Sequence, residues 1–310
     1  MSVYKRTHMC GELRKENIGE SVVLNGWIQK RRNLGGLIFC DVRDKTGITQ
    51  VVFNDQIPQE LFERADKLRS EYVVGINGKV MERESKNADL PTGDIEVFAD
   101  DLIIYSEADT PPIYIKDDDN VDDNLRLKYR YLDLRKKKMQ DNLTFRHNLA
   151  KLTRDYFAEN GFTEVETPVL TTLLTGASAR PFVTHHNTQD LDMYLRIALE
   201  LPLKRLLVGG MEAVYEIGRV FRNEGMDPKH NPEFTLMEAY LAYSNLEGMM
   251  DLTEGMFTTI ARDVMGKMTY NWCGDEINLE GPWKRISMVD AIKEQTGIDF
   301  KKEMTVEEAL

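Results

Sequence analysis

The first hundred residues alternate between apolar and polar side chains with the period of β-strands. Runs rich in β-branched and aromatic residues, separated by turns that contain glycine, predict five strands over residues 21–28, 36–44, 48–54, 72–80 and 94–105. Between the third and the fourth run, Leu61, Ala65 and Leu68 recur at helical spacing and predict one helix. The expected order is therefore three strands, a helix and two strands.

This order is that of an OB-fold barrel, a five-stranded fold that binds oligonucleotides on one face. We expect such a barrel over residues 1–106. Lys30, Arg31 and Arg32 form a basic cluster there, in a region whose first 105 residues carry 15 Lys and Arg against 17 Asp and Glu. A basic cluster on a nearly neutral domain is compatible with RNA contact, but charge alone does not establish it.

The pattern changes over residues 107–138. This segment contains two prolines, at positions 111 and 112, and five aspartates between positions 117 and 123. Such a composition predicts a linker or hinge that cannot build a core. From Met139 onward, apolar residues recur at helical spacing as far as the stop signal Asn160–Gly161. This helix opens a second domain, expected over residues 139–310, and the fold class is α+β.

Two further strand-like runs, at residues 213–222 and 233–242, enclose a polar loop and predict a hairpin. Alternation in the second run places Phe234, Glu238 and Tyr240 on one face. An aromatic ring, a carboxylate and a phenol suit a pocket floor better than a core, although a polar loop between strands is usually only solvated. At about 3.3 Å per residue, Phe234 and Glu238 lie roughly 13 Å apart, the span of an adenine ring and an attached aminoacyl group.

Composition narrows the class of protein. The 310 residues are 42% hydrophobic, enough for about two cores, and the formal net charge is −12. The three cysteines lack CxxC spacing, so neither a disulfide framework nor a zinc site is supported. The sequence shows no apolar run long enough to span a membrane and no signal peptide, and we expect a soluble cytoplasmic protein.

Three stretches resemble the class II aminoacyl-tRNA synthetases of subclass IIb. The hairpin sequence FRNEG…HNPEFTLMEAY is similar to motif 2, and GFTEVETPVL with Pro168 is similar to motif 1. RYLDLR, at 130–135, is similar to the start of the catalytic domain in this subclass. The resemblance implies an antiparallel catalytic sheet, and a homodimer whose interface uses Pro168, the helix before it and the strand around it. It also implies ATP and Mg²⁺ as cofactors and tRNA as a partner.

The two halves of the chain resemble different members of that subclass. Residues 1 to about 140 resemble bacterial aspartyl-tRNA synthetases, for example in GWIQKRRNLGGLIFCDVRDKTGITQVVFN. From about residue 165 the chain resembles lysyl-tRNA synthetases, for example in RIALELPLKRLLVGG. The second half would hold the amino acid, so lysine is the expected substrate. Leu203 stands where the aspartyl family places a lysine, and a pocket that loses a cation and gains carboxylates suits a cationic substrate.

For ATP, the resemblance assigns Arg222 as the catalytic residue. This arginine binds the α-phosphate and the substrate carboxylate, and stabilises the charge that develops when the carboxylate attacks phosphorus. Phe234 stacks on adenine, Glu224 and Asn231 lie near it, and His230 reaches the terminal phosphates. The implied reaction gives an aminoacyl-adenylate and pyrophosphate, followed by transfer to the 3′ end of tRNA, with no side-chain nucleophile.

For the amino acid, the resemblance implies that Gly176 and Glu200 receive the α-amino group, and that Glu238 and Tyr240 receive the side-chain ammonium. Glu200 has an alternative reading as a residue on a helix surface, because ELPLKRLL has helical periodicity.

For the anticodon, Arg32, Phe39 and Gln50 match positions that read bases in aspartyl enzymes. Phe39 would stack on the central uridine, Gln50 would read the edge of that base, and Arg32 would contact the third base. Glu96 is a candidate reader of the first base. Phe39 could equally be barrel core, since LIFC is continuously apolar, and its exposure decides between the two.

Motif 3, a glycine-rich stretch ending in an arginine, is not found in these 310 residues. We therefore expect a truncated chain that is inactive or weak as a synthetase, with the magnesium ligands beyond residue 310 and no metal site within the chain. Two rivals to lysine–tRNA ligase stay open. Aspartate–tRNA ligase is favoured if the anticodon module is the better guide, and a non-catalytic tRNA-binding paralogue is favoured by the missing motif.

Overall fold

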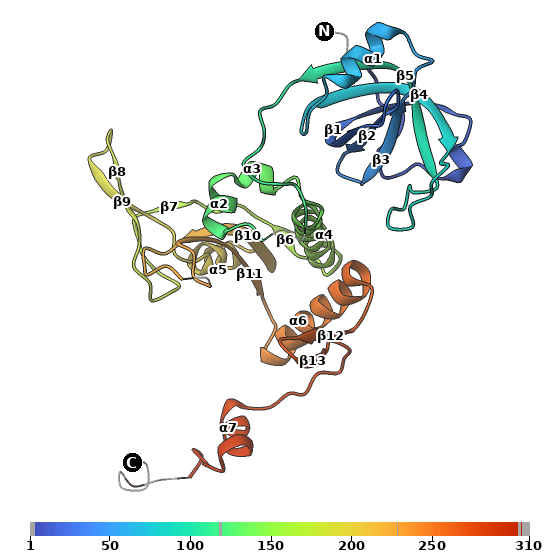
Figure 1. Ribbon diagram of the computed structural model, residues 1–310. Coiled ribbons are helices and arrows are strands. Elements are labelled where there is room, and N and C mark those ends of the chain that lie inside the picture. Colours follow the sequence, from blue (N-terminus) through green and yellow to red (C-terminus); the bar gives the residue numbers. More distant parts are fainter. Residues whose placement is uncertain (1–3, 118–119, 228, 303–304, 306–310) are drawn as a thin grey trace. The chain divides into compact units, whose positions relative to one another are not determined.

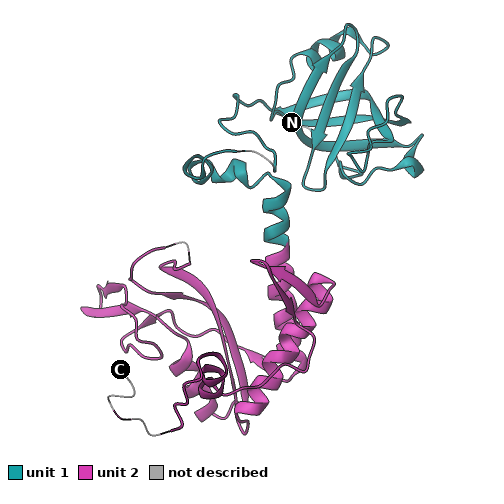
Figure 2. Ribbon diagram, turned by 60° about the horizontal axis from the view of Figure 1, so that its bottom comes forward, with its two compact units in different colours: residues 1–144 teal, residues 145–310 magenta. Residues whose placement is uncertain are grey.

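The computed structural model describes residues 4–117, 120–227, 229–302 and 305, and Figure 1 follows its helices and strands along the chain. The chain divides into two compact units, residues 1–144 and residues 145–310 (Figure 2). The helix α4, Lys137–Glu159, runs across this boundary. No helix among the described residues is both long and apolar enough to cross a membrane.

The first unit contains a closed barrel in the strand order β1-β2-β3-β5-β4 (Figure 1). After the short 3-10 helix η1, Lys15–Asn17, its elements are β1 Ser21–Asn33, β2 Ile38–Arg43, β3 Ile48–Phe53, α1 Gln59–Asp66, β4 Val73–Glu82 and β5 Ile95–Ser106. The strands β3 and β5 are parallel, and the other neighbouring pairs are antiparallel. Apolar residues from all five strands fill the interior. The predicted OB fold and the α+β class are confirmed.

The segment between the barrel and α4 is more than a linker. It contains α2, Asp123–Lys128, and α3, Arg130–Asp133, and it buries Ile113, Ile115 and Leu132 in a small apolar cluster. The prediction that this segment cannot build a core is wrong, because the apolar residues on either side of the aspartate run supply one.

Glu71 ties this segment to the barrel. Arg43 donates to both oxygens of the buried Glu71 carboxylate at 2.9 Å, and Nη1 of Arg135 donates to it at 2.7 Å. The two guanidinium groups also lie against Trp27, with their central carbons 5.9 Å and 4.9 Å from its ring. One carboxylate shared by two arginines on an aromatic ring fixes the position of Arg135 on the barrel.

A second buried carboxylate, Asp133, organises the helical segment itself. Its side chain is 0% exposed and pairs with Nε of Arg126 at 3.2 Å, Nη1 of Arg130 at 2.5 Å and Nζ of Lys136 at 3.0 Å. Burial alone would raise the pKa of Asp133, but the hydrogen bonds and charges of Arg126 and Lys136 outweigh it and hold the pKa below its usual value.

Replacing Asp133 with asparagine is expected to lower the free energy of unfolding by about 3 kcal/mol at neutral pH, because a neutral amide cannot accept the charge-assisted hydrogen bonds that the buried Asp133 carboxylate accepts from Arg126, Arg130 and Lys136. A carboxyl whose folded-state pKa is depressed stabilises the protein above its unfolded pKa of about 4, and this stabilisation is lost as the pH falls through the folded value. The difference between the two proteins should therefore shrink on acidification. Urea unfolding between neutral pH and pH 3 measures this, with Asp141→Asn, from an exposed pair with Lys137, as the control. A difference that is constant with pH would contradict the expectation.

The second unit is built on a mixed sheet in the order β11-β10-β6 (Figure 1). Its strands are β6 Thr163–Glu164, β10 Ala213–Phe221 and β11 Glu233–Leu241, with β10 antiparallel to β11 and parallel to β6. Met237 and Ala239 pack with residues of α4 and of α6, Leu246–Ile260. Phe234 and Tyr240 pack on the other face, beside the helix α5, Glu200–Val208. The predicted alternation of the two faces is confirmed.

The second unit contains a second sheet and several further short elements. A second sheet, in the order β7-β9-β8, uses β7 Leu170–Thr171, β8 Val183–His186 and β9 Leu191–Leu195. After α6 come the π-helix η2 Ala261–Met265, the pair β12 Thr269–Trp272 and β13 Asp275–Asn278, and α7 Met288–Thr296.

Candidate functional site

The hairpin β10–β11 places Arg222 and Phe234 next to each other. The backbone N–H of Arg222 donates to the Pro232 carbonyl at 2.8 Å, which closes the base of the loop. The half-buried guanidinium lies 5.2 Å from the centroid of the Phe234 ring, and its Nε and Nη2 are both 3.4 Å from the Ile197 carbonyl oxygen. A planar cation beside an exposed part of an aromatic ring can hold a phosphate and a base at once.

The other three residues expected at ATP lie on the hairpin loop and are exposed. Glu224 accepts a hydrogen bond from the backbone N–H of Arg180 at 3.3 Å. His230 contacts Asp227 through Nδ1 at 2.7 Å, and this contact is the main cause of an Asp227 pKa below its usual value. Asn231 lies beside His230 at the base of the loop. The structure therefore brings Arg222 and Phe234 together and leaves Glu224, His230 and Asn231 on the loop surface.

Glu238 and Tyr240 are joined directly on β11. The Tyr240 hydroxyl donates to Oε2 of Glu238 at 3.0 Å, and the backbone N–H of Leu199, just before α5, donates to Oε1 at 3.0 Å. Burial first, and then the bond to Glu238 and its charge, raise the pKa of Tyr240 above its ordinary value. The phenol is therefore neutral, and two neutral donors hold the half-buried Glu238 carboxylate, which forms no ion pair with any residue that the structure describes.

Gly176 and Glu200 are neighbours. A Cβ added to Gly176 would lie 3.0 Å from Cβ of Glu200 and 2.9 Å from Cβ of Ala198, and Gly176 has a φ of +86°. Both observations explain a glycine here. Glu200 is the first residue of α5, so the reading of Glu200 as a helix residue and its proximity to Gly176 both hold. Leu203, three residues further along α5, is fully buried and packs in the same apolar cluster as Tyr240.

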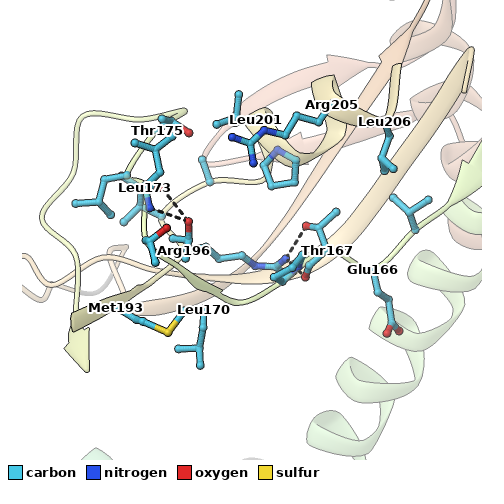
Figure 3. A pocket seen from close by; sticks show the side chains of 18 residues that line it. Glu166, Thr167, Leu170, Leu173, Thr175, Met193, Arg196, Leu201, Arg205 and Leu206 are labelled. Carbon is cyan, nitrogen blue, oxygen red and sulfur yellow. Dashed lines mark hydrogen bonds between the residues drawn. The ribbon is translucent and has the colours of Figure 1, made fainter. Parts of the chain in front are cut away.

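Arg196 and Glu216 form a buried ion pair in the second unit. Nη1 of Arg196 is 2.6 Å from Oε1 of Glu216, with both side chains almost fully buried. The same Arg196 donates to the Thr167 carbonyl at 2.9 Å and to the Arg219 carbonyl at 2.8 Å, and Glu216 accepts from the Thr167 hydroxyl at 2.5 Å. Figure 3 shows Arg196 and Thr167 on the wall of a largely apolar pocket that also contains Leu170, Leu173 and Leu206.

Pro168 follows Thr167 and is exposed. Its neighbours Val169, Leu170 and Leu173 are exposed as well, at 39%, 44% and 53%. Three large apolar side chains exposed within five residues form a patch that a partner could cover.

In the first unit, the four residues expected to read the anticodon line one cavity. Nη2 of Arg32 donates to the Gln50 side-chain oxygen at 2.9 Å, and the Gln50 amide donates to Glu96 at 2.7 Å. Phe39 is half-buried, with the Arg32 guanidinium 5.7 Å from its ring centroid, while its neighbours Ile38 and Cys40 are fully buried. Phe39 therefore faces the cavity and is not part of the barrel core.

Two further features of this cavity concern its charge. Burial raises the pKa of Glu96, although the Gln50 hydrogen bond and the charge of Arg83 oppose the change. Arg83 also lines the cavity, and the buried Nε–H groups of Arg32 and Arg83 have no hydrogen-bond partner within the described residues. Both can donate to a bound acceptor.

Comparison with known families identifies both parts of the chain. Residues 122–308 match the family described as tRNA synthetases class II (D, K and N), and residues 22–105 match the OB-fold nucleic acid binding domain. The first match covers more than half of the chain. The chain belongs to the class II aminoacyl-tRNA synthetases. The resemblance stated from its motifs is confirmed.

Both kinds of synthetase are found among its relatives. The lysine–tRNA ligases of Thermoanaerobacter pseudethanolicus and Enterococcus faecalis are each 43% identical over 99% of this chain, and the match covers 61% and 62% of those proteins. The aspartate–tRNA ligase of Clostridium botulinum is 41% identical over 84% of this chain and 44% of that protein. The chain thus spans less than two thirds of the length of these relatives.

Within this synthetase chain, sequence reasoning missed Arg196, Glu216 and Arg83. A signal for the first two was present, since each is a charged residue inside an apolar strand-like run, MYLRIAL and AVYEIGRVF. A charge in such a run is expected to be paired when it is buried. Arg83 carried no such signal, because only the closure of the barrel brings it to the cavity.

Proposed function

We propose that this chain acts as a lysine–tRNA ligase, which activates lysine with ATP and transfers it to tRNA. The observation that carries the proposal is the Glu238 carboxylate, half-buried and held by two neutral donors, Leu199 N–H and Tyr240 O–H. A half-buried carboxylate of this kind favours a cationic ligand over an anionic one. The buried Leu203, in place of the lysine of aspartyl enzymes, removes the cation that an aspartate substrate would need.

In the proposed reaction, a carboxylate oxygen of lysine attacks the α-phosphorus of ATP. The new O–P bond forms as the bond from that phosphorus to the pyrophosphate oxygen breaks, and pyrophosphate leaves with the electron pair. Arg222 holds the α-phosphate and the attacking carboxylate, and its charge stabilises the transition state. Phe234 stacks on adenine, Glu224, His230 and Asn231 contribute further contacts to ATP, and Gly176 and Glu200 receive the α-ammonium. A hydroxyl of the 3′-terminal ribose of tRNA then attacks the carbonyl carbon of the adenylate. The new ester bond forms as the bond to AMP breaks, AMP leaves with the electron pair, and the hydroxyl proton is lost to solvent.

Mg²⁺ is proposed as a cofactor from the family only. Among the residues that the structure describes, no group of three or more His, Cys, Asp or Glu side chains is arranged to hold a metal ion. The described residues therefore do not by themselves fit the ion, and no step of the reaction is assigned to it.

Amino-acid-dependent ATP–pyrophosphate exchange on the full-length protein tests the proposal, with lysine, aspartate and asparagine in parallel, because the 310 residues alone are expected to be inactive or weak. Exchange with lysine alone supports it. Exchange with aspartate alone supports the second candidate, aspartate–tRNA ligase, which is favoured by the cavity of Arg32, Phe39, Gln50 and Glu96. No exchange with any of the three, together with retained tRNA binding, supports a non-catalytic tRNA-binding protein.

We propose that the barrel cavity binds the anticodon, with Phe39 stacked on a base. Phe39→Ala is expected to weaken binding of an anticodon stem-loop by about 10-fold to 100-fold, because stacking on an aromatic side chain stabilises a bound base by roughly 1–3 kcal/mol. Fluorescence anisotropy with a labelled stem-loop at fixed salt concentration measures the change. Tyr114→Ala, at an aromatic residue 74% exposed in the same unit, is the control and should bind normally. Equal losses in both variants would refute the assignment.

We also propose a homodimer that covers the exposed apolar residues beside Pro168. The support is the 39–53% exposure of Val169, Leu170 and Leu173, which a second copy would remove from water.

A further inference from the structure

One lysine of the chain itself, with its side chain 54% exposed, lies beside the residues proposed to hold the amino acid. Lys204, on α5, forms an ion pair through Nζ with Oε1 of Glu200. The same Nζ lies 5.9 Å from the centroid of the Tyr240 ring, which is within the range of a cation–π contact. Lys204 therefore contacts one residue proposed to hold the α-ammonium and one proposed to hold the side-chain ammonium.

The two oxygens of Glu200 differ in their contacts. Oε1 is engaged by Lys204, whereas Oε2 lies on the side of Gly176, 3.5 Å from the position that a Cβ there would occupy. No described residue donates a hydrogen bond to Oε2, so this oxygen can accept one from a ligand. One oxygen of the Glu200 carboxylate therefore pairs with a cation of the chain itself, and the other can accept a hydrogen bond from a ligand.

We propose that Lys204 is a positioning residue for the substrate: it holds one oxygen of Glu200 so that the other receives the α-ammonium of the bound amino acid. The inference rests on the proposed function of this pocket. A free glutamate side chain samples several rotamers, and ordering it on binding has an entropic cost. Lys204 removes part of that cost before the substrate arrives, and the Tyr240 ring, fixed by Glu238, restrains Lys204 in turn.

An ordinary helical ion pair offers a direct comparison. Lys151 and Asp155 have the same spacing of four residues on α4, and their side chains are 65% and 45% exposed. Such a pair adds only a few tenths of a kcal/mol to helix stability. Lys204 differs because its partner is a proposed ligand of the substrate, so its effect should appear in binding and depend on which groups the ligand carries.

The test compares lysine with 6-aminohexanoate, which keeps the carboxylate and the side-chain ammonium but lacks the α-amino group. Isothermal titration calorimetry on the whole chain measures both. Lys204→Met is expected to weaken lysine binding about 5-fold to 10-fold, the loss of an oriented charge-assisted hydrogen bond, and 6-aminohexanoate binding less than about 2-fold. Lys204→Arg should restore most of the lysine affinity. Lys151→Met should change neither ligand.

A double variant isolates the route through Glu200. Once Glu200→Gln has removed the carboxylate, adding Lys204→Met should have no further effect on lysine binding. Equal losses for lysine and 6-aminohexanoate, or no loss for either, would overturn the positioning role while leaving the proposed function intact. Failure of the unsubstituted chain to bind lysine, with aspartate binding instead, would overturn the proposed function and this inference with it.

Discussion

Arg222→Gln in the full-length protein is expected to lower lysine-dependent ATP–pyrophosphate exchange by about a thousandfold or more, because an arginine on a transferring phosphoryl group commonly contributes that much. Gln keeps a polar donor but removes the charge that would face the phosphorus as it is attacked. The developing charge exists in the transition state and not in the bound substrates, so kcat should fall far more than KM rises.

Arg219→Gln is the matched control for this prediction. Arg219 lies on β10, three residues before Arg222, which follows the end of that strand, and Arg219 is exposed beside Glu233 at 3.5 Å. Arg219 pairs with Thr235, whereas its neighbour Val220 pairs with Phe234, so its side chain points away from the Phe234 face. Its loss should leave exchange within about twofold. An Arg222→Gln protein that retains more than a tenth of the activity would remove Arg222 from the proposed mechanism.

The barrel and the hairpin were predictable because their signals are local. Period-two alternation in residues 233–241 separates Phe234 and Tyr240 from Met237 and Ala239, and the structure places these pairs on opposite faces of the sheet. The same reasoning failed for residues 107–138. There, the prediction was based on the average composition of the segment, in which the aspartates outweigh the few apolar residues. Ile113 and Leu132 are distant in the sequence and come into contact only in the folded chain.

Contacts between residues that are distant in the sequence were the part of the site that could not be predicted. Strand periodicity and similarity to motif 2 identified Glu238 and Tyr240 as candidates. They did not predict the hydrogen bond from the Leu199 N–H to Glu238, which links β11 to the start of α5. Motif similarity also identified Glu200, but it did not predict that Oε1 pairs with Lys204 while Oε2 lies on the side of Gly176. Both depend on how a helix sits on a sheet, which period and motif leave open. The roles of these residues stay predictions.

The buried pair of Arg196 and Glu216 leads to the largest expected effect on stability. Arg196→Met should lower the free energy of unfolding by about 3–5 kcal/mol, because it leaves Glu216 buried without its charge partner. Chemical denaturation of the second unit, followed by circular dichroism, measures this. Arg154→Met is the control: Arg154 pairs with Glu164 at 3.0 Å, but both side chains are more than a third exposed. That variant should lose no more than about 1 kcal/mol.

Removing both charges separates an unpaired charge from lost packing. In Arg196→Met with Glu216→Leu, the carboxylate that needed a partner is gone, and about 2 kcal/mol of the loss should return. Recovery will be incomplete, because the Thr167 and Arg219 backbone groups that the pair contacts lose their partners. Gly218 adds an independent check, since a Cβ there would lie 2.3 Å from Nη2 of Arg196. Gly218→Ala should therefore destabilise the wild-type chain and do so less once Arg196 is Met. If the variant with both Arg196→Met and Glu216→Leu is as unstable as Arg196→Met alone, packing around Thr167, and not charge pairing, holds the segment after β6 against β10.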